Sequence, residues 1–85
     1  MRPEEIREFV RRQPFDPFRM TLTDGRTYDV AHPDMALVGY GSVAVGLPRP
    51  GDVDPIYDRL VTMSLSHIMQ IEPIASALPP TNEVG

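Results

Sequence analysis

The sequence predicts a mainly β protein, in which an N-terminal helix precedes a five-stranded, strongly bent antiparallel small barrel. Two alternating apolar and polar runs flank Asp24-Gly25, a pair that strongly favours a hairpin turn. Further short runs of strand character, separated by glycine and proline, fill most of the chain after this hairpin. Helical periodicity occurs only before Pro14. Closing so short a sheet into a barrel would remove most of its exposed edges.

The helix is expected over Arg2–Gln13, with Pro3 in its first turn and acidic residues near its positive end. Pro14 is expected to end it. About three turns of helix are not stable alone, so the apolar stripe must pack on the sheet. Phe15 is expected to fill the space between the helix and the barrel. The stripe consists of Ile6, Phe9 and Val10.

The hairpin loop is expected to contain three residues, Thr23–Gly25, with Gly25 in the left-handed conformation of a bulge. A two-residue turn at Asp24-Gly25 would pair buried with exposed side chains. The three-residue loop avoids this, because a shift of one residue moves every side chain to the other face. The resulting pairs are Leu22 with Arg26, Met20 with Tyr28 and Phe18 with Val30.

The rest of the chain is expected to contain one long strand and three shorter ones. The segment Arg26–Val38 would be one strand bent at His32-Pro33, because proline lacks the amide donor of a regular ladder. Further strands are expected over Val43–Leu47, Tyr57–Met63 and His67–Ile71. Gly39–Ser42 and Ser64–Ser66 would form the turns between them, and Pro48–Pro55 the longest loop.

The chain is expected to fold as a single domain over residues 1–74, which Pro73 closes by stopping the last strand. Residues 75–85 carry two adjacent prolines and few apolar side chains, and are expected to form a disordered tail. No apolar run approaches the roughly 20 residues that a membrane-spanning helix needs. No signal-peptide pattern opens the chain, so a cytoplasmic location is expected.

The composition excludes several kinds of site. The chain has no Cys, which excludes disulfides, thiolate metal sites and cysteine catalysis. All 8 basic residues are Arg, yet the net charge is −4. This charge disfavours nucleic acid as a partner and opposes binding to anionic membranes, so the expected partner is protein, including further copies of the chain.

The titratable and nucleophilic residues predict no catalytic, cofactor or metal site. His32 and His67 are the only histidines, and they are interpreted as a cap beside Pro33 and as the start of a strand. The acidic group Asp52, Asp54 and Asp58 lacks the glycine and terminal Glu of a calcium loop, and is interpreted as a solvated loop. Serines this close in sequence to His67 are poorly placed for a catalytic triad, so they are expected to form a turn.

Four segments resemble a family of small bacterial proteins: Arg11–Phe18, Leu22–Arg26, Val30–Asp34 and Leu65–Ile68. The similarity covers roughly Pro3 to Ile74. No activity is assigned to that family, so this resemblance implies no function.

The order of a helix and five strands, with an apolar first strand and a long bent second strand over Phe18–Val38, resembles Sm-like domains. A Src-homology-type barrel has a similar strand count, and the pattern does not separate the two. The Sm-like resemblance implies that the turns around Tyr40 and Leu65 lie on an RNA-binding rim, where Tyr40 would stack on a base. Serines stand where Sm-like proteins carry Arg-Gly. The residues of the expected rim are Tyr40, Ser42, Ser64, Ser66 and His67.

Together these observations predict a non-catalytic binding or assembly module that associates with itself through strand edges. The alternative is an RNA-binding Sm-like protein. Leu60 and Val61 would lie on opposite faces of the edge strand, so that one face serves the core and the other an interface. The last strand is a second candidate for the edge. The expected edge-strand residues are Tyr57, Arg59, Val61 and Met63.

Overall fold

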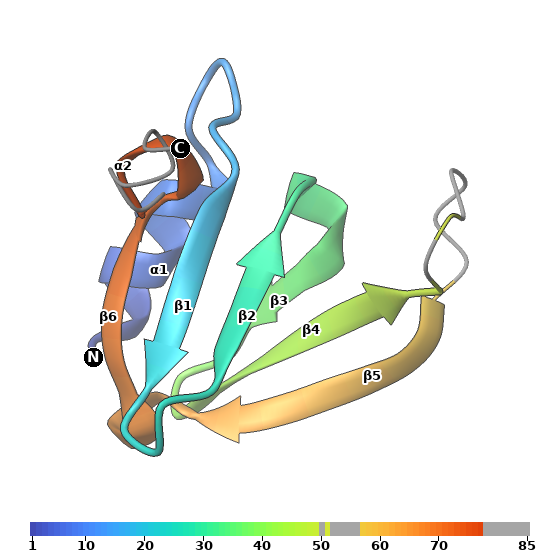
Figure 1. The fold of residues 1–85 in the computed structure, drawn as a ribbon. Coiled ribbons are helices and arrows are strands. Elements are labelled where there is room, and N and C mark those ends of the chain that lie inside the picture. Colours follow the sequence, from blue (N-terminus) through green and yellow to red (C-terminus); the bar gives the residue numbers. More distant parts are fainter. Residues whose placement is uncertain (50, 52–56, 78–85) are drawn as a thin grey trace, which may run out of the picture.

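A computed structural model of the chain describes residues 1–49, 51 and 57–77. Helix α1, Pro3–Val10, precedes six strands, two short 3-10 turns (η1 and η2) and a one-turn helix, α2 (Figure 1). In chain order after α1, the elements are β1 Phe18–Leu22, β2 Thr27–Val30, η1 Pro33–Met35, β3 Ala36–Val38, β4 Ser42–Pro48, β5 Tyr57–Ser64, η2 Leu65–His67, β6 Ile68–Pro73 and α2 Ile74–Ala77.

The strands form two antiparallel sheets of three strands each. The first sheet has the order β2-β1-β6 and the second has the order β3-β4-β5. The chain passes from one sheet to the other twice, through η1 between β2 and β3 and through η2 between β5 and β6 (Figure 1). The mainly β class with an N-terminal helix is therefore confirmed.

The closed five-stranded barrel is not confirmed, because the described part of the chain forms two separate sheets. The long strand expected over residues 26–38 is also wrong as a single element. Its two halves, β2 and β3, lie in different sheets and are separated by η1, which begins at Pro33. Proline removes a ladder donor and fixes φ, so the chain makes a 3-10 turn where a gentler bend was expected.

The predicted hairpin register is confirmed. Phe18 pairs with Val30 and Met20 with Tyr28. The amide of Leu22 donates to the carbonyl of Arg26 at 2.8 Å, and Gly25 has a φ of 93°. This φ lies in the left-handed region that glycine adopts without steric cost. The loop therefore has three residues, as the alternation of buried side chains requires.

Helix α1 is shorter than expected and packs against the first strand. It ends at Val10, well before Pro14, which agrees with the tendency of helices to stop ahead of the residue that precedes a proline. The Phe9 and Phe18 rings are 5.4 Å apart, and the Phe15 and Phe18 rings are 6.0 Å apart. Phe15 thus lies where the sequence placed it, beside the junction of helix and sheet.

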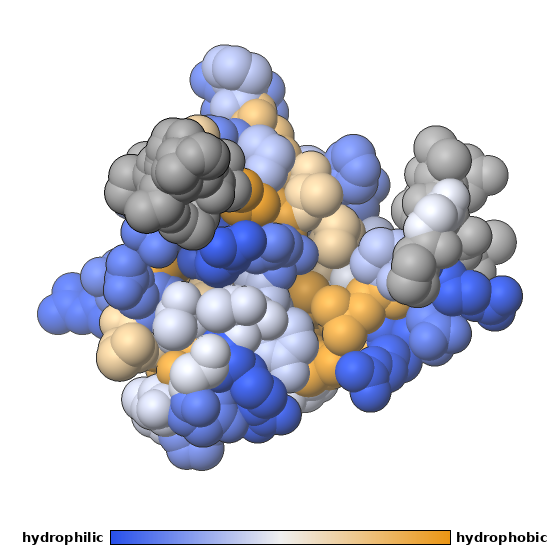
Figure 2. All heavy atoms as spheres, in the orientation of Figure 1, coloured by the Kyte–Doolittle hydropathy of each residue, from blue (hydrophilic) through white to orange (hydrophobic). Residues whose placement is uncertain are grey.

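One hydrophobic core joins the two sheets and the helix. Figure 2 shows hydrophobic residues gathered over the region between the sheets, with hydrophilic residues over much of the remaining face. The fully buried residues come from α1 and from both sheets: Ile6, Phe18, Met20, Val30, Val43 and Val45.

The end of the described chain differs from the expectation. Strand β6 ends at Pro73, two residues beyond the expected end at Ile71, and α2 covers the first residues of the expected tail. The amide of Ile74 donates to the carbonyl of Pro17 at 3.0 Å, which fixes this end against the start of β1. Residues 78–85, and most of the expected long loop between Pro48 and Pro55, lie outside the described residues. None of the described helices is long and apolar enough to cross a membrane.

Candidate functional site

Three turns meet at one end of the molecule. They are the β1–β2 loop, the β3–β4 turn and η2, and Figure 1 shows the first and third side by side at the lower end. The amide of Leu65 donates to the carbonyl of Gly41 at 3.0 Å, and the amide of Thr23 donates to the carbonyl of His67 at 2.9 Å. The N-terminal ammonium of Met1 also donates to the carbonyl of Leu65, at 3.4 Å. Backbone bonds thus hold the turns together.

The structure brings the residues of the expected rim together at this end. Ser42 and Ser64 are register partners in β4 and β5. The hydroxyls of Ser64 and Ser66 lie 2.9 Å apart, and the Ser64 hydroxyl accepts from the amide of Ser66 at 3.3 Å. These bonds make Ser64 the N-terminal cap of η2. The turn-forming interpretation of the two serines is therefore confirmed.

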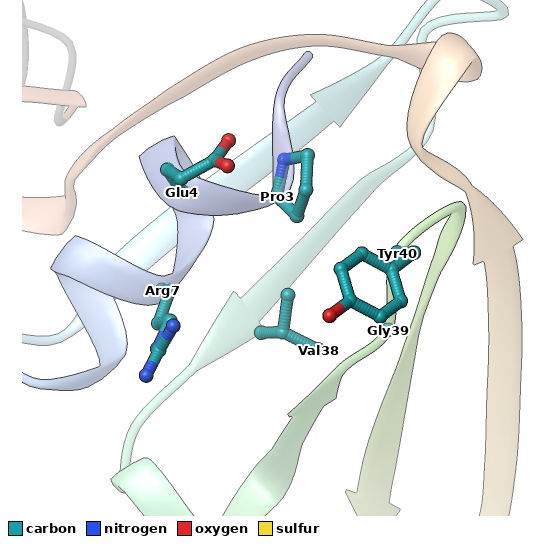
Figure 3. A pocket seen from close by; sticks show the side chains of 6 residues that line it. All are labelled: Pro3, Glu4, Arg7, Val38, Gly39 and Tyr40. Atoms are coloured by element: carbon teal, nitrogen blue, oxygen red, sulfur yellow. The ribbon is translucent and has the colours of Figure 1, made fainter.

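Tyr40 is the most exposed large hydrophobic side chain of the described chain, at 98%. It lies between Gly39 and Gly41 and borders an open pocket of about 300 Å³. The other walls of the pocket come from the first turns of α1 and from the end of β3 (Figure 3). The lining residues are Pro3, Glu4, Arg7, Val38, Gly39 and Tyr40.

Sequence reasoning identified Tyr40 but missed the α1 side of this pocket. Contacts between α1 and β3 place the helix there, and the two elements lie some 30 residues apart in the chain. No local pattern in the sequence indicates which strand a short helix will contact. Only the amphipathic stripe signalled that α1 must pack on a sheet at all.

The charged residues of the β1–β2 hairpin are paired. Arg26 donates from its side chain to Asp24 at 2.8 Å, and its amide donates to the same carboxylate at 3.0 Å. The backbone hydrogen bond, with support from the guanidinium, holds the pKa of the Asp24 carboxyl below its usual range. The carboxylate in turn raises the pKa of Arg26. The arginine of this hairpin loop is thus already paired with a carboxylate.

The histidines and acidic residues form no metal-binding group among the residues that the structure describes. His32 is the N-cap residue of η1, beside Pro33, as interpreted from the sequence. His67 is the last residue of η2, so the expectation that it begins a strand is wrong by one residue. Asp58 lies in β5 with its carboxylate 3.6 Å from the Arg49 guanidinium, whereas Asp52 and Asp54 lie outside the described residues.

Strand β5 is an edge of the second sheet, because among the described strands it pairs with β4 alone. Its side chains alternate as predicted. Met63 is buried and Val61 half-buried against the core, whereas Leu60 on the opposite face is 70% exposed. Of the other expected edge residues, Tyr57 is half-buried and Arg59 is exposed. Of the predicted edge set, Val61 and Met63 thus serve the core, and the backbone is what this edge offers to a partner.

Comparison of the chain with protein-family models, with curated proteins and with solved structures gave no match.

Proposed function

We propose that this protein is a non-catalytic binding or assembly module that associates with further copies of itself through the free edge of β5. The observation that carries this proposal is the length of the edge. Strand β5 has 8 residues, and within the described chain its outer side meets no other strand. An edge of this kind presents a row of amides and carbonyls to which another strand can add.

The C-terminal part of β5, Leu60–Ser64, is best suited to pairing with another strand. Asp58 and Arg59 carry charges at the start of β5, and charges on an edge discourage strand addition. From Leu60 to Ser64 the strand is uncharged. We therefore place the contact over Leu60–Ser64. The facing strand in the second copy is its own β5 or its β6, which is the edge of the first sheet.

The arrangement of the sheets supports an Sm-like or Src-homology-like relationship, which we propose together with the assembly role. Two three-stranded sheets joined at two crossings are what a small, strongly bent barrel becomes when its long strands break at the corners. In the Sm-like case, edge pairing would give a ring or a dimer. The cytoplasmic location stays a prediction from the sequence.

The first test is the solution mass, measured by light scattering during size-exclusion chromatography with absorbance recorded at 260 and 280 nm. Edge assembly predicts a defined multimer of the 9.5 kDa chain that carries no nucleic acid. A monomer at every concentration would overturn the proposal.

The second test locates the contact by amide hydrogen exchange followed residue by residue with NMR. In the multimer, every second amide between Leu60 and Ser64 should become protected as the concentration rises. The amides of β1 are the internal control, because this strand is paired on both sides in the monomer. A multimer without new protection in β5 or β6 would contradict edge pairing.

The alternative function is RNA binding at the rim, and the exposure of Tyr40 is the observation that favours it. A protruding ring supplies the stacking surface that single-stranded nucleic acid uses, worth about 1–3 kcal/mol per base. This function predicts that nucleic acid copurifies with the protein and that the affinity for RNA falls as the salt concentration rises. It also predicts that Tyr40→Ala loses about 1–3 kcal/mol of RNA-binding free energy. Ser66→Ala is the matched control on the same rim. No binding of an oligoribonucleotide mixture at low salt would exclude it.

A further inference from the structure

The outer face of the second sheet is the side that points away from the core. In β4, Val43 and Val45 are buried, so the residues between them point outward, and the strand register carries this assignment to β3 and β5. The outer face so defined consists of Leu37 from β3, Ser42, Ala44 and Gly46 from β4, and Leu60, Thr62 and Ser64 from β5.

Two large apolar side chains protrude from this face. Leu37 is 74% exposed and Leu60 is 70% exposed. They lie on the two outer strands, and the small residue Ala44 lies on the strand between them. Leu37 is the register partner of Ala44, whereas Leu60 is the partner of Gly46, two residues further along β4. The outer face therefore carries a diagonal apolar stripe with a shallow centre.

The ring of Tyr57 fills one end of this stripe. A Cβ added at Gly46 would lie 2.6 Å from that ring, so glycine is what allows the ring to lie flat against β4. Gly46 is buried although it lies on the outer face. The half-buried ring, which also packs against the core, thus covers the backbone at the Gly46 end of this face.

Charge is almost absent from the outer face. Its seven residues include no Asp, Glu, Arg or His, in a chain of which 24% is charged. An antiparallel sheet with one face on the core usually carries polar and charged residues on the other. The charged residues that the structure describes therefore lie outside this set of seven.

We infer that the outer face of the second sheet binds the same face of a second copy of this chain, with the two sheets packed face to face about a two-fold axis. Like charges oppose the meeting of two molecules of net charge −4, and an uncharged face is where this repulsion is smallest. A basic partner would instead be drawn to carboxylates, and none of the seven residues of this face carries one. The neutrality of the face thus favours a second copy over a partner of opposite charge.

The shape of the stripe fits itself. In a two-fold contact, a residue i that touches j is matched by j touching i. Leu60 of each copy can then pack into the shallow centre of the stripe, at Ala44 of the other copy. Sheets that pack face to face lie about 10 Å apart and cross at about 30°, which suits a stripe that runs diagonally across the strands.

The size of the face predicts a weak dimer. Strands of 3, 7 and 8 residues cover roughly 300 Å² in projection, given strand spacings of about 4.8 Å and about 3.3 Å per residue. A stable interface buries about 800 Å² on each partner. This contact goes beyond the proposed edge pairing, which involves the backbone of the edge strand β5 and leaves the outer face of the sheet uncovered.

The test is sedimentation velocity of the full chain from about 10 µM to about 1 mM, together with NMR of leucine and alanine methyl groups. We expect a concentration-dependent dimer and shifts that grow at Leu37, Ala44 and Leu60. In Leu37→Ser the dimer dissociation constant should rise at least tenfold. Leu37 lies in β3, on the side of the sheet opposite to the β5 edge, so this variant leaves edge pairing intact.

Met69→Ser is the matched control. Met69 is also a large exposed hydrophobic residue, at 60%, but it lies in β6 of the first sheet. Its replacement should leave the dissociation constant unchanged. Circular dichroism of both variants checks that they fold.

Three outcomes overturn the inference: a monomer at all concentrations, an equal effect of Met69→Ser and Leu37→Ser, and a dimer that Leu37→Ser leaves unchanged. The third result, accompanied by new amide protection in β5, would retain edge assembly while removing the face contact. Methyl shifts at Leu37 without new amide protection in β5 or β6 would retain the face contact and remove edge assembly.

Discussion

The two sheets of this protein have similar, buried inner faces, but their outer faces differ in character: one carries charges and the other is apolar. On the outer face of the first sheet, Arg19 lies between its cross-strand neighbours Asp29 and Glu72. Its guanidinium binds both carboxylate oxygens of Asp29, at 2.7 and 3.1 Å, and these contacts raise the pKa of Arg19. The corresponding face of the second sheet carries the exposed Leu37 and Leu60.

This difference teaches which residues the fold requires. Both inner faces are buried in one core, through Phe18 and Met20 on one side and Val43 and Val45 on the other. The outer faces contribute little to that core, so their composition is free to serve another purpose. An exposed ion pair such as Arg19–Asp29 suits water. Exposed leucines on the second sheet add nothing to the fold that polar residues would not, and this is why we assign that face to contact.

The largest expected effect comes from a substitution on the buried inner face of the first sheet. Phe18→Ala should lower the free energy of unfolding by about 3–5 kcal/mol, since the ring is fully buried and contacts the rings of Phe9 and Phe15. Because the sheets share one core, β4 and β5 should lose protection together with β1. Urea unfolding followed by circular dichroism and by amide exchange measures both quantities.

The matched control for this prediction is Leu37→Ala, on the outer face. It removes a large side chain that is mostly exposed, so the change in unfolding free energy should stay within about 0.5 kcal/mol. If Phe18→Ala unfolded the first sheet and left the second protected, the single core would be the wrong description.

The next effect compares the tight turns of the two sheets. Gly25 has a φ of 93° and no heavy atom within 4 Å of an added Cβ, so Gly25→Ala adds backbone strain without a steric clash. We expect a loss of about 1 kcal/mol in unfolding free energy. An added Cβ at Gly41, in the β3–β4 turn, also meets nothing within 4 Å, but Gly41 lacks the positive φ. Gly41→Ala should therefore be neutral or slightly stabilising, and equal losses in chemical denaturation would show that φ is not the cause.

Local patterns were sufficient to predict the β1–β2 hairpin, but not the pairing of β1 with β6 or the division of the strands into two sheets. The alternation through Phe18, Met20 and Leu22, with Gly25 in the loop, determined the register of β1 and β2 because neighbouring residues decide it. The break at Pro33 was visible, but whether the chain bends or changes sheet depends on which strands it meets later. This is a non-local property.

The candidate sites show the same limit. Tyr40 and the serines of η2 could be named from the sequence because they lie in turns. The α1 side of the pocket and the stripe from Leu37 to Leu60 could not, because each depends on elements brought together from distant parts of the chain. Side-chain alternation predicted that Leu60 and Val61 point to opposite faces. It did not predict that Leu37 shares the face of Leu60.

The smallest expected effect is a pH dependence confined to the hairpin of the first sheet. The folded-state pKa of Asp24 lies below its ordinary value of 3.8, chiefly because the carboxylate accepts the Arg26 amide. The ionised group therefore contributes stability that is fully present above pH 3.8 and is lost as the pH falls through the folded-state pKa. The β3–β4 turn, Gly39–Gly41, contains no carboxylate and should show no such dependence.

Urea unfolding between about pH 2 and pH 6, compared for the wild type and Asp24→Asn, isolates this contribution. The asparagine oxygen can still accept the Arg26 amide but cannot titrate, so the two stability curves should converge at low pH and separate above pH 3.8. The separation should be small, since the carboxylate is exposed and water screens its interaction with the guanidinium. Parallel curves over the whole pH range would contradict this prediction. They would mean that the charge of Asp24 does not affect the stability of the hairpin, which would then depend only on the shape of its loop.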